Sequence, residues 1–551
     1  MLKQWLLIRW VQMSLAIVAI IVGTGALGLV AWWSGSPLLA VAFLSVGIMA
    51  ATFIVGLALV RLILSPGHPV LAVARTLVDE AIRMKVAVVL IIVLMVIVPF
   101  MPVLFDPQER LSYRLNTFLT YSIMICSLLL SLMTIFLGCG TVANDLKYRH
   151  VFMSLTKPIG RGQYLLGKWL GIALLNLLLI CVTGLVIDGL AIMMARYGRP
   201  VDELDAAIVM EEVLTARESK LPEYPGDLNQ AVQAEIERRE RDIPGAFLNM
   251  TPEEARQRVT QELIQQWHAI APLNHHGFVF RGLEKVKERG GWMQLRLKPR
   301  QGGGTNTIRF RMQINGREVL PDGRPMPPIA NDTYYRLPLE ASLINDKGEL
   351  HVAIRNQHPI DPRLTPNMTL QFEPGEGLEL LVQSGTFAPN LAKGMFVLWI
   401  RLCCLGMLGL VAATFLSFPV AALFTMMVYF AAVGSAFISE SLHSYAAFGF
   451  KDDVLLIEKI GLIISELMSK LAAGEIGQVF KFVLKGIGSV FMLMIPSFGD
   501  LDPVPMVSDG RVVPGEMLWD AVWKVGLLWT GLAGVIGWQI FRRRELARVI
   551  V

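Results

Sequence analysis

The sequence has little charge and few cysteines. Only 17% of its 551 residues are charged and 54% are hydrophobic, with a mean hydropathy of +0.53. Soluble globular domains carry about 25% charged residues, so this composition excludes a chain that is soluble throughout. The cysteines lie in apolar stretches without CxxC or Cys/His spacing, which indicates packing residues: Cys126, Cys139, Cys181, Cys403 and Cys404.

The sequence also lacks the motifs of nucleotide, metal and catalytic sites. Residues 162–169, GQYLLGKW, fit GxxxxGK, but Trp169 stands where a P-loop has Ser or Thr, and an apolar run follows. The adjacent His275 and His276 have no further ligands in a suitable pattern, so we expect solvated loop residues. No HExxH motif or carboxylate pair occurs in an apolar run, which argues against an intramembrane enzyme. We predict no catalytic residue, metal or bound cofactor.

Long apolar runs dominate what is present. A hydrocarbon core about 30 Å thick requires about 20 apolar residues of helix. Eight runs meet this criterion, and we predict a polytopic α-helical membrane protein with about eight spans: 11–33, 38–60, 86–105, 117–139, 167–194, 396–416, 418–438 and 517–540. The segment 440–500 reads instead as amphipathic or re-entrant helices, one of them at 454–471.

Basic residues gather at one set of ends of these runs. Their positions place both termini in the cytoplasm by the positive-inside rule, in the inner (plasma) membrane: Lys3, Arg9, Arg61, Arg75, Arg83, Lys85, Lys147, Arg149, Lys157, Arg161, Lys168, Arg542, Arg543, Arg544 and Arg548. Residues 201–392 hold 22 basic and 27 acidic residues, net −5, against 28 and 18, net +10, elsewhere. This distribution indicates contact with an anionic lipid surface and no nucleic-acid partner.

The block 196–392 is predicted to be an external α+β domain. It begins with charged helical sequence at 231–242 and 251–267, which we interpret as a helical stalk. After residue 276 the apolar period becomes two, as in Met293, Leu295 and Leu297, so we expect an antiparallel β-sandwich whose strands each have one buried face. The chain then divides into two extra N-terminal spans (1–66), a first membrane half (67–195), this domain, and a second membrane half (393–551).

Residues 143–171 read ANDLKYRHVFMSLTKPIGRGQYLLGKWLG, between the fourth and fifth runs. This segment resembles the permeases of ABC-2 type exporters, including those grouped with multicopper-enzyme maturation, in an acidic residue, a short amphipathic helix, a Pro and Arg, and a Gly-Lys pair. Asp145, Pro158, Arg161, Gly167 and Lys168 match in order. The resemblance extends to GVIGWQIFRRREL and IPSFGDLDP, covering roughly 75–195 and 395–548. Arg149-His150 replaces the family's usual Gly-Thr, and the external block and first two spans are additions.

The resemblance implies a six-helix permease core paired with a second copy or a paralogue. A separate cytoplasmic ABC ATPase, which would hold ATP and Mg²⁺, would dock on the coupling segment 141–165. Asp145, Lys147 and Arg149 would then offer charges to the ATPase, and Arg161 and Lys168 would anchor the next helix to lipid phosphates. Pro158 would end an amphipathic lever. The plainer alternative is that these are ordinary positive-inside residues.

Two charges, Asp188 and Arg401, fall inside predicted spans at similar depth. Such charges are costly and usually paired, so the two could form an ion pair with each other. Alternatively, Arg401 extends towards the interface and Asp188 faces a wet vestibule.

The functional expectation is an export permease that does no chemistry on its cargo. The alternative is a membrane-anchored external binding or sensory protein, in which the sandwich recognises an external protein or substrate. The number of spans, more than an anchor needs, favours the permease.

Overall fold

The computed structural model describes residues 2–64, 67–147, 160–243, 247, 252–302, 307–318, 329–356, 369–375, 377–438 and 495–543. Within these residues, six helical stretches are long and apolar enough to cross a bilayer. They confirm a multi-pass membrane protein, and they are α2 (Pro37–Ile63), α4 with η1 (Lys85–Leu104), α5 (Leu111–Lys147), α7 (Arg161–Tyr197), α12 (Phe387–Phe415) and the last stretch (Gly515–Arg543).

The other two expected spans form shorter apolar helices. α1 (Leu2–Trp33) contributes the apolar stretch Ile17–Trp33 and packs along α2, and α13 (Phe418–Val433) packs on α12. The amphipathic and re-entrant helices expected within 440–500 fall outside the described residues up to 494. Beyond them, the chain forms the short helix α17 (Val504–Ser508).

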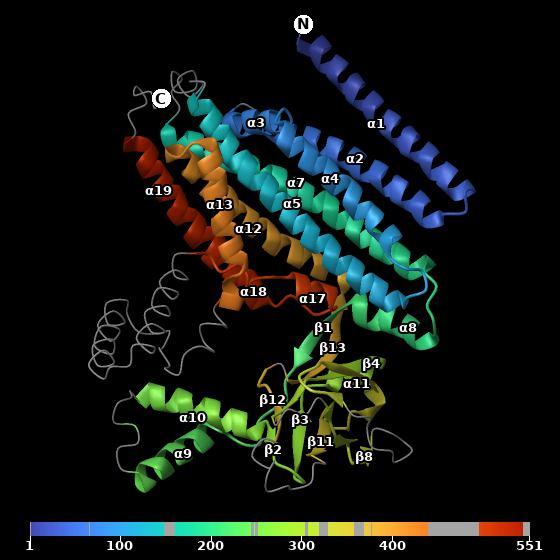
Figure 1. Cartoon of the computed structure of the whole chain (residues 1–551), viewed down its shortest axis with the longest axis vertical. Coiled ribbons are helices and arrows are strands. Elements are labelled where there is room, and N and C mark those ends of the chain that lie inside the picture. The colour runs from blue at the N-terminus through green and yellow to red at the C-terminus, as the bar shows by residue number, and fades with distance from the viewer. Residues whose placement is uncertain are drawn as a thin grey trace. The chain divides into compact units, whose positions relative to one another are not determined.

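The chain divides into two compact units, of which the first comprises Met1–Leu214 and Thr386–Val551. α12 is its central helix, since 83% of its most apolar 18-residue stretch is buried. It packs against α5, α7, α13 and α19 (Figure 1). Indole groups fix α12 to α7: Trp169 Nε1 donates to Cys403 O and Trp399 Nε1 donates to Ala173 O, both at 2.9 Å. These hydrogen bonds satisfy backbone and indole groups that cannot reach water.

The last span is not a uniform α-helix. It consists of α18 (Gly515–Asp520), a nine-residue π-helix, η5 (Ala521–Trp529), and α19 (Thr530–Arg543). The Thr530 hydroxyl donates to Val525 O at 2.8 Å, which matches the wider π turn. The span therefore departs from regular α-helical geometry over these nine residues. π segments are rare, and they recur at functional sites.

Short helices close the ends of the long ones. α3 (Pro69–Ala81) is amphipathic and packs on α7, while α8 (Glu203–Ile208) and the π-turn η2 (Val209–Val213) pack near the start of α5. Asp205 of α8 accepts the N–H groups of Leu111 and Ser112 at 2.9 and 3.0 Å. Burial alone raises the pKa of Asp205, but the hydrogen bonds from Ser112, Val201 and Leu111 outweigh it and leave that pKa lowered. Its carboxylate therefore caps α5.

The second unit, Thr215–Gly385, is an inserted region of small antiparallel sheets and helices. Its sheets have the strand orders β1-β13-β4-β10, β3-β11-β7-β8, β2-β12-β5 and β6-β9. The strands are β1 (Thr215–Lys220), β2 (Ala269–Ile270), β3 (His275–Phe280), β4 (Trp292–Leu297), β5 (Pro299–Gln301), β6 (Thr307–Ile308), β7 (Phe310–Ile314), β8 (Arg317–Glu318), β9 (Ile329–Ala330), β10 (Tyr335–Glu340), β11 (Leu350–Asn356), β12 (Leu370–Phe372) and β13 (Leu378–Thr386). The helices are α9 (Leu228–Asp242), α10 (Pro252–Trp267) and α11 (Glu284–Arg289).

The alternating pattern at 293–297 predicted β4, and one apolar core joins most of the strands. β7 and β8 form a hairpin whose turn, Asn315-Gly316, has positive φ at both residues, as an Asn-Gly turn requires. The expectation of a single buried face is wrong for β4. Its polar residues are also buried, because Arg296 forms an ion pair with Glu379 at 2.8 Å and Gln294 accepts from Arg217 at 2.6 Å.

The expectation that His275 and His276 lie in a loop is also wrong, because both belong to β3. The His276 ring packs against Trp267 and Phe278, at centroid distances of 5.8 and 4.9 Å. Burial lowers the pKa of His276, and the neighbouring His268 and His275 lower it further. Within the described residues, no group of three His, Cys, Asp or Glu side chains is placed to hold a metal ion.

Candidate functional site

The predicted coupling residues that the structure describes lie where α3, α5, α7 and α19 meet. α7 begins at Arg161, and its first turn is closed by the Gly160 N–H, which donates to the Gln163 side chain at 3.0 Å. α5 is described up to Lys147, and α7 begins at Arg161. Arg149 and Pro158 lie outside the described residues.

Lys168 forms the centre of an ion network. Its Nζ lies 2.8 Å from Glu80 Oε2 of α3 and 2.9 Å from Asp145 Oδ2 of α5. The side chain of Lys168 is only 4% exposed, against 16% for Asp145 and 29% for Glu80. A lysine this deeply buried requires partners, and here one ammonium group holds two carboxylates on two other helices.

An aromatic pair covers this network. The Tyr164 hydroxyl donates to Asp145 Oδ2 at 2.5 Å, and its ring stacks on Phe541 of α19 with centroids 6.0 Å apart. Tyr164 and Phe541 are 2% and 1% exposed. The carboxylate of Asp145 is therefore fixed from α7 by both a cation and a hydroxyl, in surroundings that strengthen both interactions.

Arg161 joins α19 to the same point. Its Nη1 donates to the main-chain oxygens of Phe541 and Arg542, both at 2.8 Å. These carbonyls belong to the last described turn of α19. Arg161 therefore ties the first residue of α7 to the described end of α19.

Glycines allow α3 to pack closely on α7. A Cβ atom at Gly167 would lie 2.7 Å from Val73 Cβ and 2.8 Å from Val70 O, and one at Gly171 would lie 2.8 Å from Ala74 O. The pair has the small-xxx-small spacing that lets two helix backbones approach. This contact sets Glu80 within reach of Lys168.

The geometry corrects two sequence interpretations. Lys168 does not reach lipid phosphates, because it is buried in its ion pairs, and Arg161 binds α19 carbonyls. Asp145 is held within the chain and is not turned outwards as a docking charge. Of the charges predicted to meet a partner, Lys147 is exposed.

The intramembrane charges do not pair with each other. Arg401 Nη1 lies 3.3 Å from Asp502 Oδ1, and its guanidinium carbon lies 5.2 Å from the centroid of the Phe498 ring. Arg401 is 6% exposed, whereas the side chain of its partner Asp502 is 41% exposed. Asp188 lines a largely apolar groove between α7 and α12.

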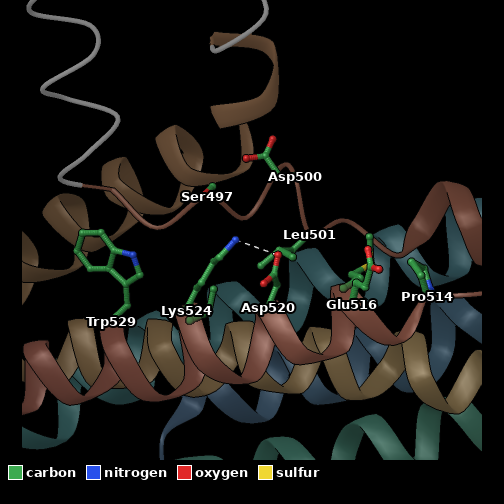
Figure 2. Close-up of a pocket in the computed structure, with 10 residues that line it drawn as sticks. Ser497, Asp500, Leu501, Pro514, Glu516, Asp520, Lys524 and Trp529 are labelled. Atoms are coloured by element: carbon green, nitrogen blue, oxygen red, sulfur yellow. Dashed lines mark hydrogen bonds and ion pairs between the residues drawn. The ribbon is translucent and has the colours of Figure 1, made fainter. Parts of the chain in front are cut away.

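A further cavity, of about 270 Å³, lies between the segment around Ser497 and the last span (Figure 2). Figure 2 shows Asp500, Glu516 and Asp520 around it, with Lys524 donating to Asp520 at 2.9 Å. Leu501 and Val525 contribute apolar surface to its lining. Its carboxylates do not converge as a metal site, as noted above for the described residues.

Sequence reasoning missed Glu80, Tyr164 and Asp502. Glu80 follows Asp79 in the amphipathic stretch before the third apolar run. Its position on the buried face of that stretch was the signal that could have identified it. Tyr164 and Asp502 lie inside segments already singled out, but their spacing from Asp145 and Arg401 carries no pattern. Only the packing of distant helices brings them together.

The arrangement is an ion and hydrogen-bond network that connects α3, α5, α7 and α19, and comparisons with known proteins do not extend this description. No protein-family model, curated protein or solved structure matches the chain.

Proposed function

We propose that the chain is the membrane-spanning permease subunit of an ATP-driven exporter of the ABC-2 type. A separate cytoplasmic ATPase would act on the coupling segment, and a second copy or a paralogue would complete the pathway. In this proposal both termini are cytoplasmic, the unit 215–385 is external, and the membrane is the inner (plasma) membrane. Cargo passes without chemical change.

The observation that carries the proposal is the Lys168 network. The coupling segment 141–165 includes Asp145 at the described end of α5 and Arg161 at the start of α7. Asp145 and Lys168 connect both helices to α3 through Glu80, and Arg161 connects them to α19. A force applied to the segment therefore reaches four helices, three of which pack on the central α12. Two-state helix shifts of this kind change the opening of a pathway.

The alternative of a membrane-anchored recognition protein is favoured by one observation. The unit 215–385 has its own apolar core, as an independent binding module would. An anchor, however, does not require a buried ion network across three helices at the far end of α5 from Leu111.

Purification of the full-length chain from its native membrane tests the proposal. The expected result is that a soluble protein with Walker motifs co-purifies in near-equal amount, and that its ATP hydrolysis depends on the chain. The variant Lys168→Met should retain the bound ATPase and change its rate of hydrolysis, whereas Lys85→Met, at an exposed lysine that opens α4, should change neither. Absence of any ATPase from the native complex would contradict the proposal and favour the anchor.

A further inference from the structure

A groove of about 380 Å³ runs between α7 and α12, from Leu177 to Asp188 on one helix and from Ala388 to Trp399 on the other. Trp399 Nε1 donates to Ala173 O and Trp169 Nε1 donates to Cys403 O, so residue numbers rise along α7 as they fall along α12 and the two helices run antiparallel. Asp188 therefore lies at the end of the groove that holds the first turns of α12. Leu177 and Trp399 lie at the opposite end.

The groove combines a carboxylate with an apolar surface. Asp188 is its one ionisable lining residue apart from Cys181, and Asp188 Oδ1 is buried with no hydrogen-bond partner among the residues that the structure describes. A carboxylate in such surroundings is costly unless a donor or a cation meets it. Leu185 and Phe396, which line the groove, are 68% and 40% exposed, so the groove opens towards the bilayer.

The depth of Asp188 fits the level of a lipid headgroup. α7 has 37 residues, which makes it about 55 Å long at about 1.5 Å per residue, longer than a hydrocarbon core of about 30 Å. Its end therefore extends beyond the hydrocarbon, and Asp188 lies nine residues before Tyr197. From Asp188 to Leu177 the groove follows α7 for about 16 Å, close to the thickness of one leaflet of that core.

We propose that this groove binds a phospholipid with a primary amine. The ammonium group pairs with the Asp188 carboxylate, and one acyl chain lies along the apolar surface towards Trp399. Charge complementarity selects the headgroup, because a primary ammonium can donate an N–H hydrogen bond to the Asp188 carboxylate and a quaternary ammonium offers no such donor. The inference requires only a membrane-embedded chain and does not rest on the proposed function.

Native mass spectrometry of the full-length protein tests this binding. The protein is released from nanodiscs that contain equal amounts of phosphatidylethanolamine and phosphatidylcholine, and retained lipids are counted. The wild type should retain phosphatidylethanolamine about tenfold over phosphatidylcholine, a difference of about 1.4 kcal/mol. Asp188→Asn should reduce this ratio to about two or less, and Asp188→Glu should keep it. Glu516→Gln removes an acid outside the groove and should leave the ratio unchanged.

A second pair of variants keeps the test independent of Asp188. A Cβ atom at Gly184 would lie 3.5 Å from Met395 Cγ, an ordinary contact, so Gly184→Ala should fold and bind as the wild type. Gly184→Leu fills the groove and should reduce retention of phosphatidylethanolamine about tenfold although Asp188 is intact. Equal retention of both lipids by the wild type, an unchanged ratio in Asp188→Asn, or normal retention in monodisperse Gly184→Leu would overturn the proposal. Crosslinking of Asp188 to a basic residue of a second copy would also overturn it.

Discussion

Replacement of Lys168 by Met removes the ammonium group that lies between the carboxylates of Glu80 and Asp145. Loss of one partner from a buried ion pair destabilises a protein by about 3–5 kcal/mol. Because Glu80 is 29% exposed, water relieves part of this penalty, and we expect a loss of about 2–4 kcal/mol. Methionine retains the apolar stem, so the loss reports the removed ion pairs and not a cavity.

Neutralising the whole network should restore stability. In the triple variant Glu80→Gln, Asp145→Asn, Lys168→Met, no charge of the network remains buried, and the new amide oxygen at position 145 can still accept from the Tyr164 hydroxyl. We expect its free energy of unfolding to lie within about 1 kcal/mol of the wild type. Steric trapping in bicelles measures these free energies, with Lys85→Met as the matched surface control, expected within about 0.5 kcal/mol. A single Lys168→Met variant as stable as this control would refute the reasoning.

Two further predictions concern helix packing and capping. Gly167→Val should separate α3 from α7 and destabilise the helical unit by about 1–3 kcal/mol; thermal unfolding checks this, and Gly189→Val, where a Cβ has no neighbour within 4 Å, should cost at most about 1 kcal/mol. Asp205→Asn should cost about 1–2 kcal/mol at neutral pH. The lowered pKa of Asp205 makes its contribution full above the unfolded-state value, near pH 4, and lost as pH falls through the folded-state value. Wild type and Asp205→Asn should therefore converge below about pH 4; a difference independent of pH, or a destabilised Gly189→Val, would contradict these predictions.

The sequence predicted the membrane helices well because their signal is local. About 20 consecutive apolar residues identify a span wherever it packs, and six of the eight expected runs are long apolar helices. Strands with strict alternation, such as β4 and β7, were also predictable, since alternation and an Asn-Gly turn are local patterns. The boundaries were less predictable: α12 begins at Phe387, nine residues before the expected span, because the preceding turns are helical without being strongly apolar.

The candidate site could be predicted only in part. A motif located Asp145, Arg161 and Lys168, but not what they bind, because Glu80 is 88 residues from Lys168 and Phe541 is 380 from Arg161. The pairing of Arg401 with Asp502 depends likewise on a return of the chain 101 residues later. Buried polar residues such as Gln294 and Arg296 follow the exposed half of an alternating pattern, and only their partners in neighbouring strands explain their burial.

The central claim is that a cytoplasmic ATPase contacts the coupling segment and acts through the Lys168 network. Site-specific photo-crosslinking in native membranes tests it most directly, with the probe at Met153 within that segment and a control probe at Tyr113, an exposed residue near the start of α5. The account predicts that a Walker-motif ATPase crosslinks at Met153 and not at Tyr113. Crosslinking of that ATPase at Tyr113, or its absence from Met153 while it co-purifies with the chain, would contradict the account.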